Sequence, residues 1–131
     1  MFRLNRFLPA LLAGFLIAFG VQAHHGGAAY TSDDYVSVTG VVTNFQFINP
    51  HVLIYIAVTG DGGGVVEWSG ELTSPNRLAR MMGDSTIQWH KDLLQPGDEI
   101  SLGGNPARSG APSLRLRSVV RGDGTVLIGD D

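Results

Sequence analysis

Hydrophobic and polar positions alternate along much of the chain, and this period of two predicts β-strands rather than helices. The clearest alternation runs from His51 to Val58. Its two faces are Val52, Ile54, Ile56 and Val58 on one side, and His51, Leu53, Tyr55 and Ala57 on the other. Because both faces are largely apolar, this strand is expected to lie in a closed or covered sheet.

Further strands are predicted where β-branched and aromatic residues recur between turn residues. They are Val36–Phe47, Val65–Ser69, Glu99–Leu102, Leu114–Val119 and Val126–Ile128. Segments rich in glycine and proline predict loops or turns at residues 59–64, 95–98 and 121–124, and two further segments of this kind, 103–106 and 109–112, are predicted to flank another loop. Gly40 lies inside the first strand and indicates a bulge or a bend.

One helix is predicted, with Pro75 at its first position. Ser74 can cap the first turn, proline is favoured where the helix begins, and Gly83 is a natural stop. Residues 84–94 show no clear period. Their apolar side chains are expected to cap the barrel, namely Ile87, Trp89, Leu93 and Leu94.

The order of these elements favours a mainly β fold. Short strands, glycine-rich turns and one short helix between strands 3 and 4 predict a small five- to six-stranded OB-like β-barrel. A β-sandwich is the alternative.

The first 23 residues have the three regions of a secretory signal peptide. A basic start with Arg3 and Arg6 precedes an apolar run from Phe7 to Val21, and Val21-Gln22-Ala23 is a cleavage signal. The alternative is an uncleaved membrane anchor, but the apolar run is short for a span, which needs about 20 residues. We therefore expect export to the periplasm.

The expected domain organisation follows from this cleavage. Residues 1–23 form the signal peptide, residues 24–35 a flexible N-terminal arm, and residues 36–131 a single β-barrel domain. Loss of Arg3 and Arg6 changes the formal charge from −3 to −5. A mildly acidic exported domain is a poor candidate for nucleic-acid binding, which requires a basic surface. No membrane contact is expected after cleavage, and the oligomeric state is left open.

The composition excludes thiol chemistry, because the chain contains no cysteine. Disulfides, thiolate metal sites and thiol catalysis are therefore absent. No serine lies in a nucleophile-elbow context, and the glycines at 60–64 are not followed by a phosphate-binding lysine and helix. We therefore expect no enzymatic activity.

Three histidines occupy positions that favour metal binding. Proline restricts the residue before it, so Asn49-Pro50 predicts a sharp corner with His51 at the start of a strand. Cleavage after Ala23 would give His24 a free α-amino group beside its imidazole. Together with His51 this makes a nitrogen-rich set that favours Cu(II), with His25 as an alternative ligand. Copper is the cofactor that the sequence indicates.

Two other interpretations stay open for these residues. The His-His-Gly-Gly arm could be merely polar, with His51 capping the corner through a backbone hydrogen bond. Alternatively, Met81 and Met82 with a tryptophan and a histidine could hold Cu(I). His90, between Trp89 and Lys91, is expected to be a surface or packing residue rather than a ligand.

The chain resembles the DUF6152 family of small exported bacterial proteins, which is functionally uncharacterised. The motifs that carry the resemblance are His24-His25 after the signal peptide, Asn49-Pro50-His51, Trp68, Ser74-Pro75-Asn76, Pro96-Gly97-Asp98, Pro106-Ala107 and Leu114-Arg115-Leu116. The resemblance implies an exported β-domain. In overall plan the chain is also similar to periplasmic OB-fold metallochaperones, but a fold does not determine function.

The rival functional class is a ligand- or protein-interaction module. OB-like barrels bind across one sheet face, and an aromatic face around Phe45, Phe47, Tyr55 and Trp68 would serve this purpose. The expected partners are thus a metal ion or an unidentified periplasmic protein.

Overall fold

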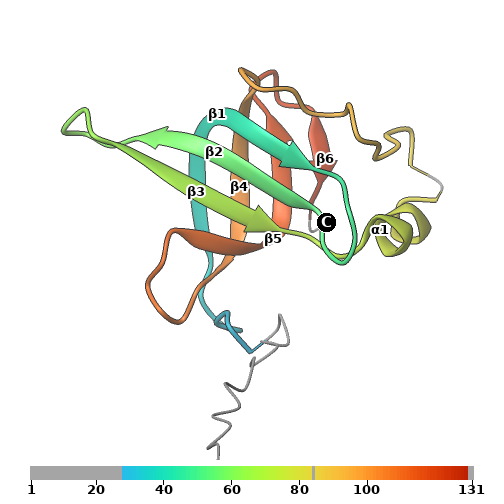
Figure 1. The fold of residues 1–131 in the computed structure, drawn as a ribbon, viewed down its shortest axis with the longest axis horizontal. Helices are drawn as coiled ribbons and strands as arrows, with labels where there is room; N and C mark the ends of the chain where they lie inside the picture. The colour runs from blue at the N-terminus through green and yellow to red at the C-terminus, as the bar shows by residue number, and fades with distance from the viewer. Residues whose placement is uncertain (1–27, 84, 130–131) are drawn as a thin grey trace, which may run out of the picture.

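The computed structural model describes residues 28–83 and 85–129, which form six strands and one helix. The elements in chain order are β1 (Val36–Gln46), β2 (Leu53–Thr59), β3 (Val65–Glu71), α1 (Pro75–Met81), β4 (Glu99–Pro106), β5 (Ser113–Arg121) and β6 (Val126–Ile128). The single helix thus lies between strands 3 and 4, as predicted (Figure 1).

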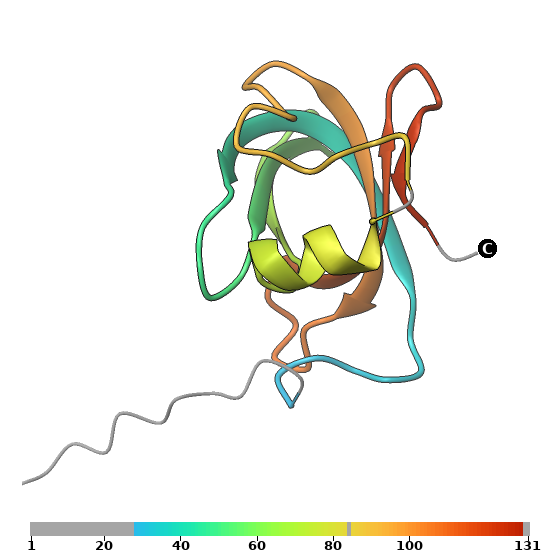
Figure 2. The ribbon, with the colours of Figure 1, turned by 90° about the vertical axis from the view of Figure 1, so that its right-hand side faces the viewer.

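The strands close into a barrel. Antiparallel pairing gives the order β3-β2-β1-β4-β5, and parallel pairing of β3 with β5 completes the ring. β6 pairs with β5 as an additional strand. Figure 2 looks down this ring, with α1 across its opening. The OB-like prediction is therefore confirmed, and the sandwich alternative is wrong because β3 and β5 join the two edges of the sheet.

β1 bends around the barrel and belongs to two pairings. Val36 to Val41 pair with β4, and Val41 to Gln46 pair with β2. The register shifts between Val42 and Asn44, so the irregularity falls after Gly40. Gly40 itself packs closely on β2, because an added Cβ would lie 3.0 Å from the carbonyl carbon of Ala57.

The barrel interior contains the apolar face that the sequence predicted for β2. Val52, Ile54 and Ile56 are fully buried. They meet inward-facing side chains from the other strands, which include Val42, Ile100, Leu102, Leu114, Val119 and Leu127. This core is the main source of stability, because burial of apolar side chains is the dominant favourable term in folding.

α1 covers one end of the barrel. The Ser74 Oγ accepts a hydrogen bond from the Arg77 backbone N–H at 3.4 Å, so the predicted cap is present. The side chain of Leu78 is fully buried beneath the helix.

Residues 85–98, which follow α1, also cap the core, although they form no helix or strand. Trp89 and Leu94 are buried, and Ile87 and Leu93 pack against the core, as predicted. The Trp89 Nε1 donates to the backbone oxygen of Leu127 at 3.2 Å, and its ring lies 6.3 Å from that of Phe45.

β4 runs to Pro106, four residues beyond the predicted strand end at Leu102, because residues 103–106 pair with β5. Gly103 and Gly104 pair with Ser118 and Leu116 of β5 across a register shift. Two glycines favour a turn in the sequence. In the barrel they allow β4 and β5 to approach closely.

Part of the predicted N-terminal arm, residues 24–35, lies against the barrel. Tyr30 is buried and forms an isolated bridge with Ala107. The Asn105 side chain donates to the backbone oxygen of Asp34 at 2.7 Å. These contacts place the segment from residue 29 onward at a defined position beside β4 and β5.

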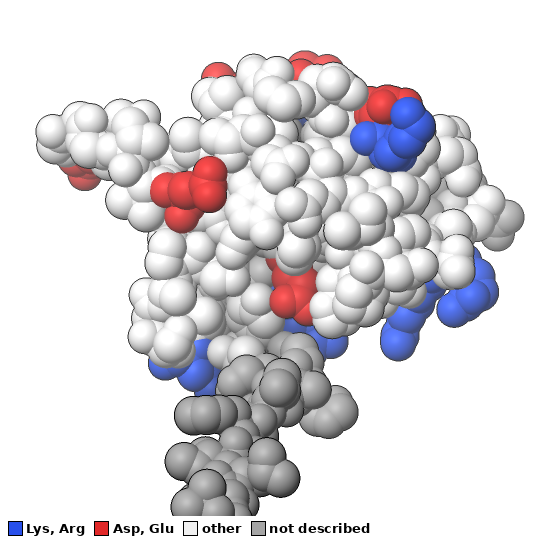
Figure 3. All heavy atoms as spheres, viewed as in Figure 1, with Lys and Arg blue, Asp and Glu red and all other residues white. Residues whose placement is uncertain are grey.

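The signal peptide, His24 and His25 lie outside the described residues. Within residues 28–83 and 85–129, no helix has the length and apolar character needed to span a membrane. On the face in Figure 3, charged side chains occur in small separate groups among uncharged atoms.

Candidate functional site

His51 lies at the predicted corner, two residues before β2 begins. Its side chain is 43% exposed. The next residue, Val52, is fully buried, and its backbone is held by the segment after β3. Its N–H donates to Thr73 and its carbonyl accepts from Leu72. A rigid backbone thus presents a half-exposed imidazole.

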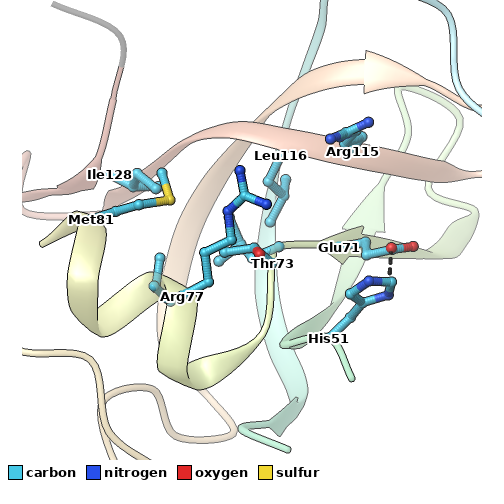
Figure 4. A pocket seen from close by; sticks show the side chains of 10 residues that line it. His51, Glu71, Thr73, Arg77, Met81, Arg115, Leu116 and Ile128 are labelled. Carbon is cyan, nitrogen blue, oxygen red and sulfur yellow. Dashed lines mark ion pairs between the residues drawn. The ribbon is translucent and has the colours of Figure 1, made fainter. Parts of the chain in front are cut away.

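The imidazole is oriented by Glu71, the last residue of β3. The Nδ1 of His51 lies 2.8 Å from the Oε1 of Glu71, whose side chain is 22% exposed (Figure 4). A neutral imidazole that donates from Nδ1 carries its lone pair on Nε2. This contact therefore leaves Nε2 as the nitrogen that can bind a metal.

Glu71 also binds the N-terminal segment. The Tyr30 hydroxyl donates to the Oε2 of Glu71 at 3.1 Å and lies 3.1 Å from the Oγ of Ser113. Ser69 in turn donates to Ser113 at 3.0 Å. One carboxylate therefore connects the N-terminal segment with the corner that carries His51.

Burial raises the pKa of the Tyr30 hydroxyl, and the negative charge of Glu71 raises it further, although the hydrogen bond with Ser113 opposes this. The folded state therefore keeps this proton to higher pH than the unfolded chain. The free energy of unfolding should fall as the pH rises above about 10, the ordinary pKa of tyrosine.

The Tyr30→Phe variant tests this pH dependence. Loss of the hydrogen bonds of the hydroxyl should lower the free energy of unfolding by about 1 kcal/mol near pH 8. The difference in stability from wild type should shrink as the pH rises above about 10, because phenylalanine has no proton to lose. Urea unfolding at several pH values measures it, and a difference that is constant with pH would contradict the interpretation.

A pocket of about 320 Å³ adjoins this pair. His51, Glu71 and Thr73 line one part of it, and Arg77 of α1 and Arg115 of β5 also line it (Figure 4). The remaining wall is apolar and consists of Leu72, Leu78, Met81, Leu116 and Ile128.

The other candidate residues have ordinary surroundings. His90 is exposed, as predicted, and its Nδ1 accepts the backbone N–H of Asp92 at 3.2 Å. Met81 is 61% exposed, whereas Met82 packs against the core. The indole N–H of Trp89 is bonded to a backbone oxygen. The two methionines therefore face different environments rather than one ion.

The predicted aromatic face is wrong, because strand pairing divides its members between two sides of the sheet. Phe45 pairs with Ile54, and Trp68 pairs with Ile56, so both share the side of buried residues. Tyr55 lies between these positions on β2 and therefore points to the opposite side.

The sequence indicated His51 but missed its partners. β3 runs to Glu71, two residues beyond the predicted end at Ser69. If the predicted strand had been continued to this point, alternation would have placed Glu71 on the same face as Ser69. No local pattern connects Tyr30 with either residue. Within the described parts of the chain, no cluster of three or more His, Asp or Glu side chains could hold a metal.

Comparisons with known proteins give one family and a distant structural similarity. The model of DUF6152, described as a family of unknown function, matches residues 14–114. The comparison with curated proteins finds no match. A similar solved structure is the mitochondrial single-stranded DNA binding protein Rim1 of S. cerevisiae, at 12% identity and a TM-score of 0.41. The match covers 76% of this chain and 100% of that one.

Proposed function

The chain belongs to DUF6152, a family of unknown function, and we propose that it is an exported periplasmic, non-enzymatic β-barrel domain that binds Cu(II). The ligands are the α-amino group and imidazole of His24 and the Nε2 of His51, with His25 as an alternative ligand. The observation that carries this proposal is the 2.8 Å contact between His51 Nδ1 and Glu71.

This contact is the arrangement that metal-binding histidines use. Such a histidine donates its other ring N–H to a carboxylate, which sets the tautomer and ring orientation and increases the basicity of the ligand nitrogen. Here Glu71 contacts Nδ1 and the imidazole is half exposed. A histidine that only capped the corner through the backbone would not need this carboxylate.

The position of the N-terminal segment makes a meeting of His24 and His51 feasible. The Tyr30 hydroxyl and His51 bind the two oxygens of the same carboxylate. His24 lies six positions before Tyr30 in the sequence, and that length of chain spans up to about 20 Å.

The donor set favours copper over harder ions. Imidazole and amine nitrogens suit Cu(II) in tetragonal geometry. An α-amino group has a pKa of about 8, so part of it is deprotonated near neutral pH. Because cleavage after Ala23 creates this amine, the proposal requires export and processing.

The test is a copper titration of protein that a bacterial host has exported and processed, after mass spectrometry confirms that His24 is the first residue. We expect one tight Cu(II) site with nitrogen hyperfine structure in the EPR spectrum. His24→Ala and His51→Ala should each weaken binding at least about tenfold. His90→Ala is the matched control and should bind as wild type does. Equal affinity in wild type and His51→Ala would overturn the proposal.

Glu71→Gln tests the role of the carboxylate separately. Loss of a carboxylate behind a ligand histidine costs about 10- to 100-fold in metal affinity, so we expect a reduction in this range. Glu67→Gln is its control, because Glu67 lies on the same face of β3 and accepts a hydrogen bond from the exposed Thr43 hydroxyl at 3.1 Å. Equal copper affinities in the two variants would exclude Glu71 as the orienting group.

A further inference from the structure

We propose that the pocket beside α1 binds a small organic carboxylate with an apolar body, through Arg77 and Arg115. His51 also lines this pocket, but the site does not depend on the proposed copper ligands His24 and His25.

The two arginines reach the pocket from different elements. Arg77 extends from α1 into the pocket, and Arg115 lines it from β5, where its backbone pairs with Glu71 of β3 (Figure 4). A guanidinium presents a planar set of N–H donors that matches a carboxylate with two parallel hydrogen bonds. Two such groups on one small pocket make a receptor for an oxyanion.

Neither arginine has an acidic partner in the described parts of the chain. The ion pairs there are His51 with Glu71 and Lys91 with Asp92. The two oxygens of Glu71 are already bonded to His51 and Tyr30. The pocket therefore carries two positive charges against one negative charge, in a chain whose formal net charge is −3.

The rest of the lining decides which kind of anion fits. Leu72, Leu78 and Leu116 are buried core residues that also form the pocket wall. They expose almost no surface themselves, so the apolar surface that a ligand can cover belongs mainly to Met81, which is 61% exposed, and to Ile128. An inorganic anion would leave it in contact with water, whereas an acid with a hydrocarbon body would cover it.

The size of the pocket limits the ligand. Its volume of about 320 Å³ lies at the lower end of the range for small-molecule sites, about 300–1,000 Å³. The inferred ligand class is therefore a short-chain aliphatic or single-ring aromatic carboxylate.

Calorimetric titration of metal-free, processed protein with octanoate tests the proposal, at octanoate concentrations below its critical micelle concentration. Octanoate should bind at one site. Acetate, which has the carboxylate but almost no hydrocarbon chain, should bind about a hundredfold more weakly. Octanol, which has the hydrocarbon chain but no charge, should bind about tenfold more weakly. Phosphate that binds as tightly as octanoate would overturn the choice of a carboxylate.

Matched variants locate the site. Arg77→Gln and Arg115→Gln should each weaken octanoate about tenfold, because each removes a charged hydrogen-bond donor. Arg80→Gln, in the last turn of the same helix, and Arg108→Gln, in the exposed loop before β5, should stay within about twofold of wild type. Circular dichroism should confirm that all four variants fold. Equal losses in all four would overturn the proposal, because they would show only a general charge effect.

The same titration in the His24→Ala variant separates this proposal from the copper proposal. Octanoate affinity should be unchanged there. If the protein fails to bind copper but binds octanoate normally, the copper proposal is wrong and the carboxylate proposal is supported. If octanoate does not bind to wild type or to His24→Ala, the carboxylate site is excluded whatever the copper result.

Discussion

Gly104→Ala is expected to lower the free energy of unfolding by about 3 kcal/mol or more. Gly104 is buried in β4 and pairs with Leu116 next to a register shift. An added Cβ would lie 2.8 Å from the carbonyl carbon of Arg115 and 2.9 Å from the Cα of Leu116. These are backbone atoms, so they can move away only if β4 and β5 separate. Domains are stable by about 5–15 kcal/mol, so this change removes a large part of the total.

Urea unfolding of a glycine-to-alanine series measures this effect. At Gly62 the added methyl group meets nothing within 4 Å, so Gly62→Ala is the control and should leave stability nearly unchanged. At Gly70 the methyl group would lie 2.6 Å from a side-chain carbon of Leu116, which can rotate, so an intermediate loss is expected. Equal stability of the Gly62 and Gly104 variants would show that the strands are not packed as described.

Trp89→Ala is the second change with a large expected effect, about 3–5 kcal/mol in the free energy of unfolding. Trp89 is 6% exposed, contacts the core and lies against Phe45. Its indole N–H bonds to the Leu127 carbonyl in β6. Alanine would leave a cavity at the barrel end and an unpaired backbone oxygen on β6.

A graded comparison separates packing from the hydrogen bond. Trp89→Phe keeps most of the ring volume but loses the donor, so it should cost about 1–3 kcal/mol. His90→Ala changes the exposed neighbour and should cost less than about 0.5 kcal/mol. Chemical unfolding followed by far-UV circular dichroism suits all three variants. A Trp89→Ala protein as stable as His90→Ala would mean that residues 85–98 do not cap the core.

Local patterns were sufficient for most of the elements. Alternation predicted β2 because a strand with one buried face must repeat every two residues. The helix was predicted from Ser74 and Pro75, whose preference for its start is a property of the first turn alone. Such local signals fail where the conformation of a segment is decided by residues far away in the sequence. The predicted strand ended at Leu102, but Gly103 and Gly104 continue it because β5 pairs with them.

The candidate site was predictable only in part, for the same reason. Proline at position 50 placed His51 at a corner, and this needs no knowledge of distant residues. Glu71 lies 20 residues further along the chain and Tyr30 lies 41 residues before Glu71. Only the pairing of β3 with β2 and β5 brings these groups together.

The sequence by itself determined the strand pattern, the helix, the absence of thiol chemistry and the corner that presents His51. The tertiary structure alone decided that Glu71 orients this histidine and that Arg77 and Arg115 share a pocket. It also decided that the aromatic residues divide between two sides of the sheet. The physical reason is that periodicity and caps act within a few residues, whereas barrel closure and strand register set the contacts between distant side chains.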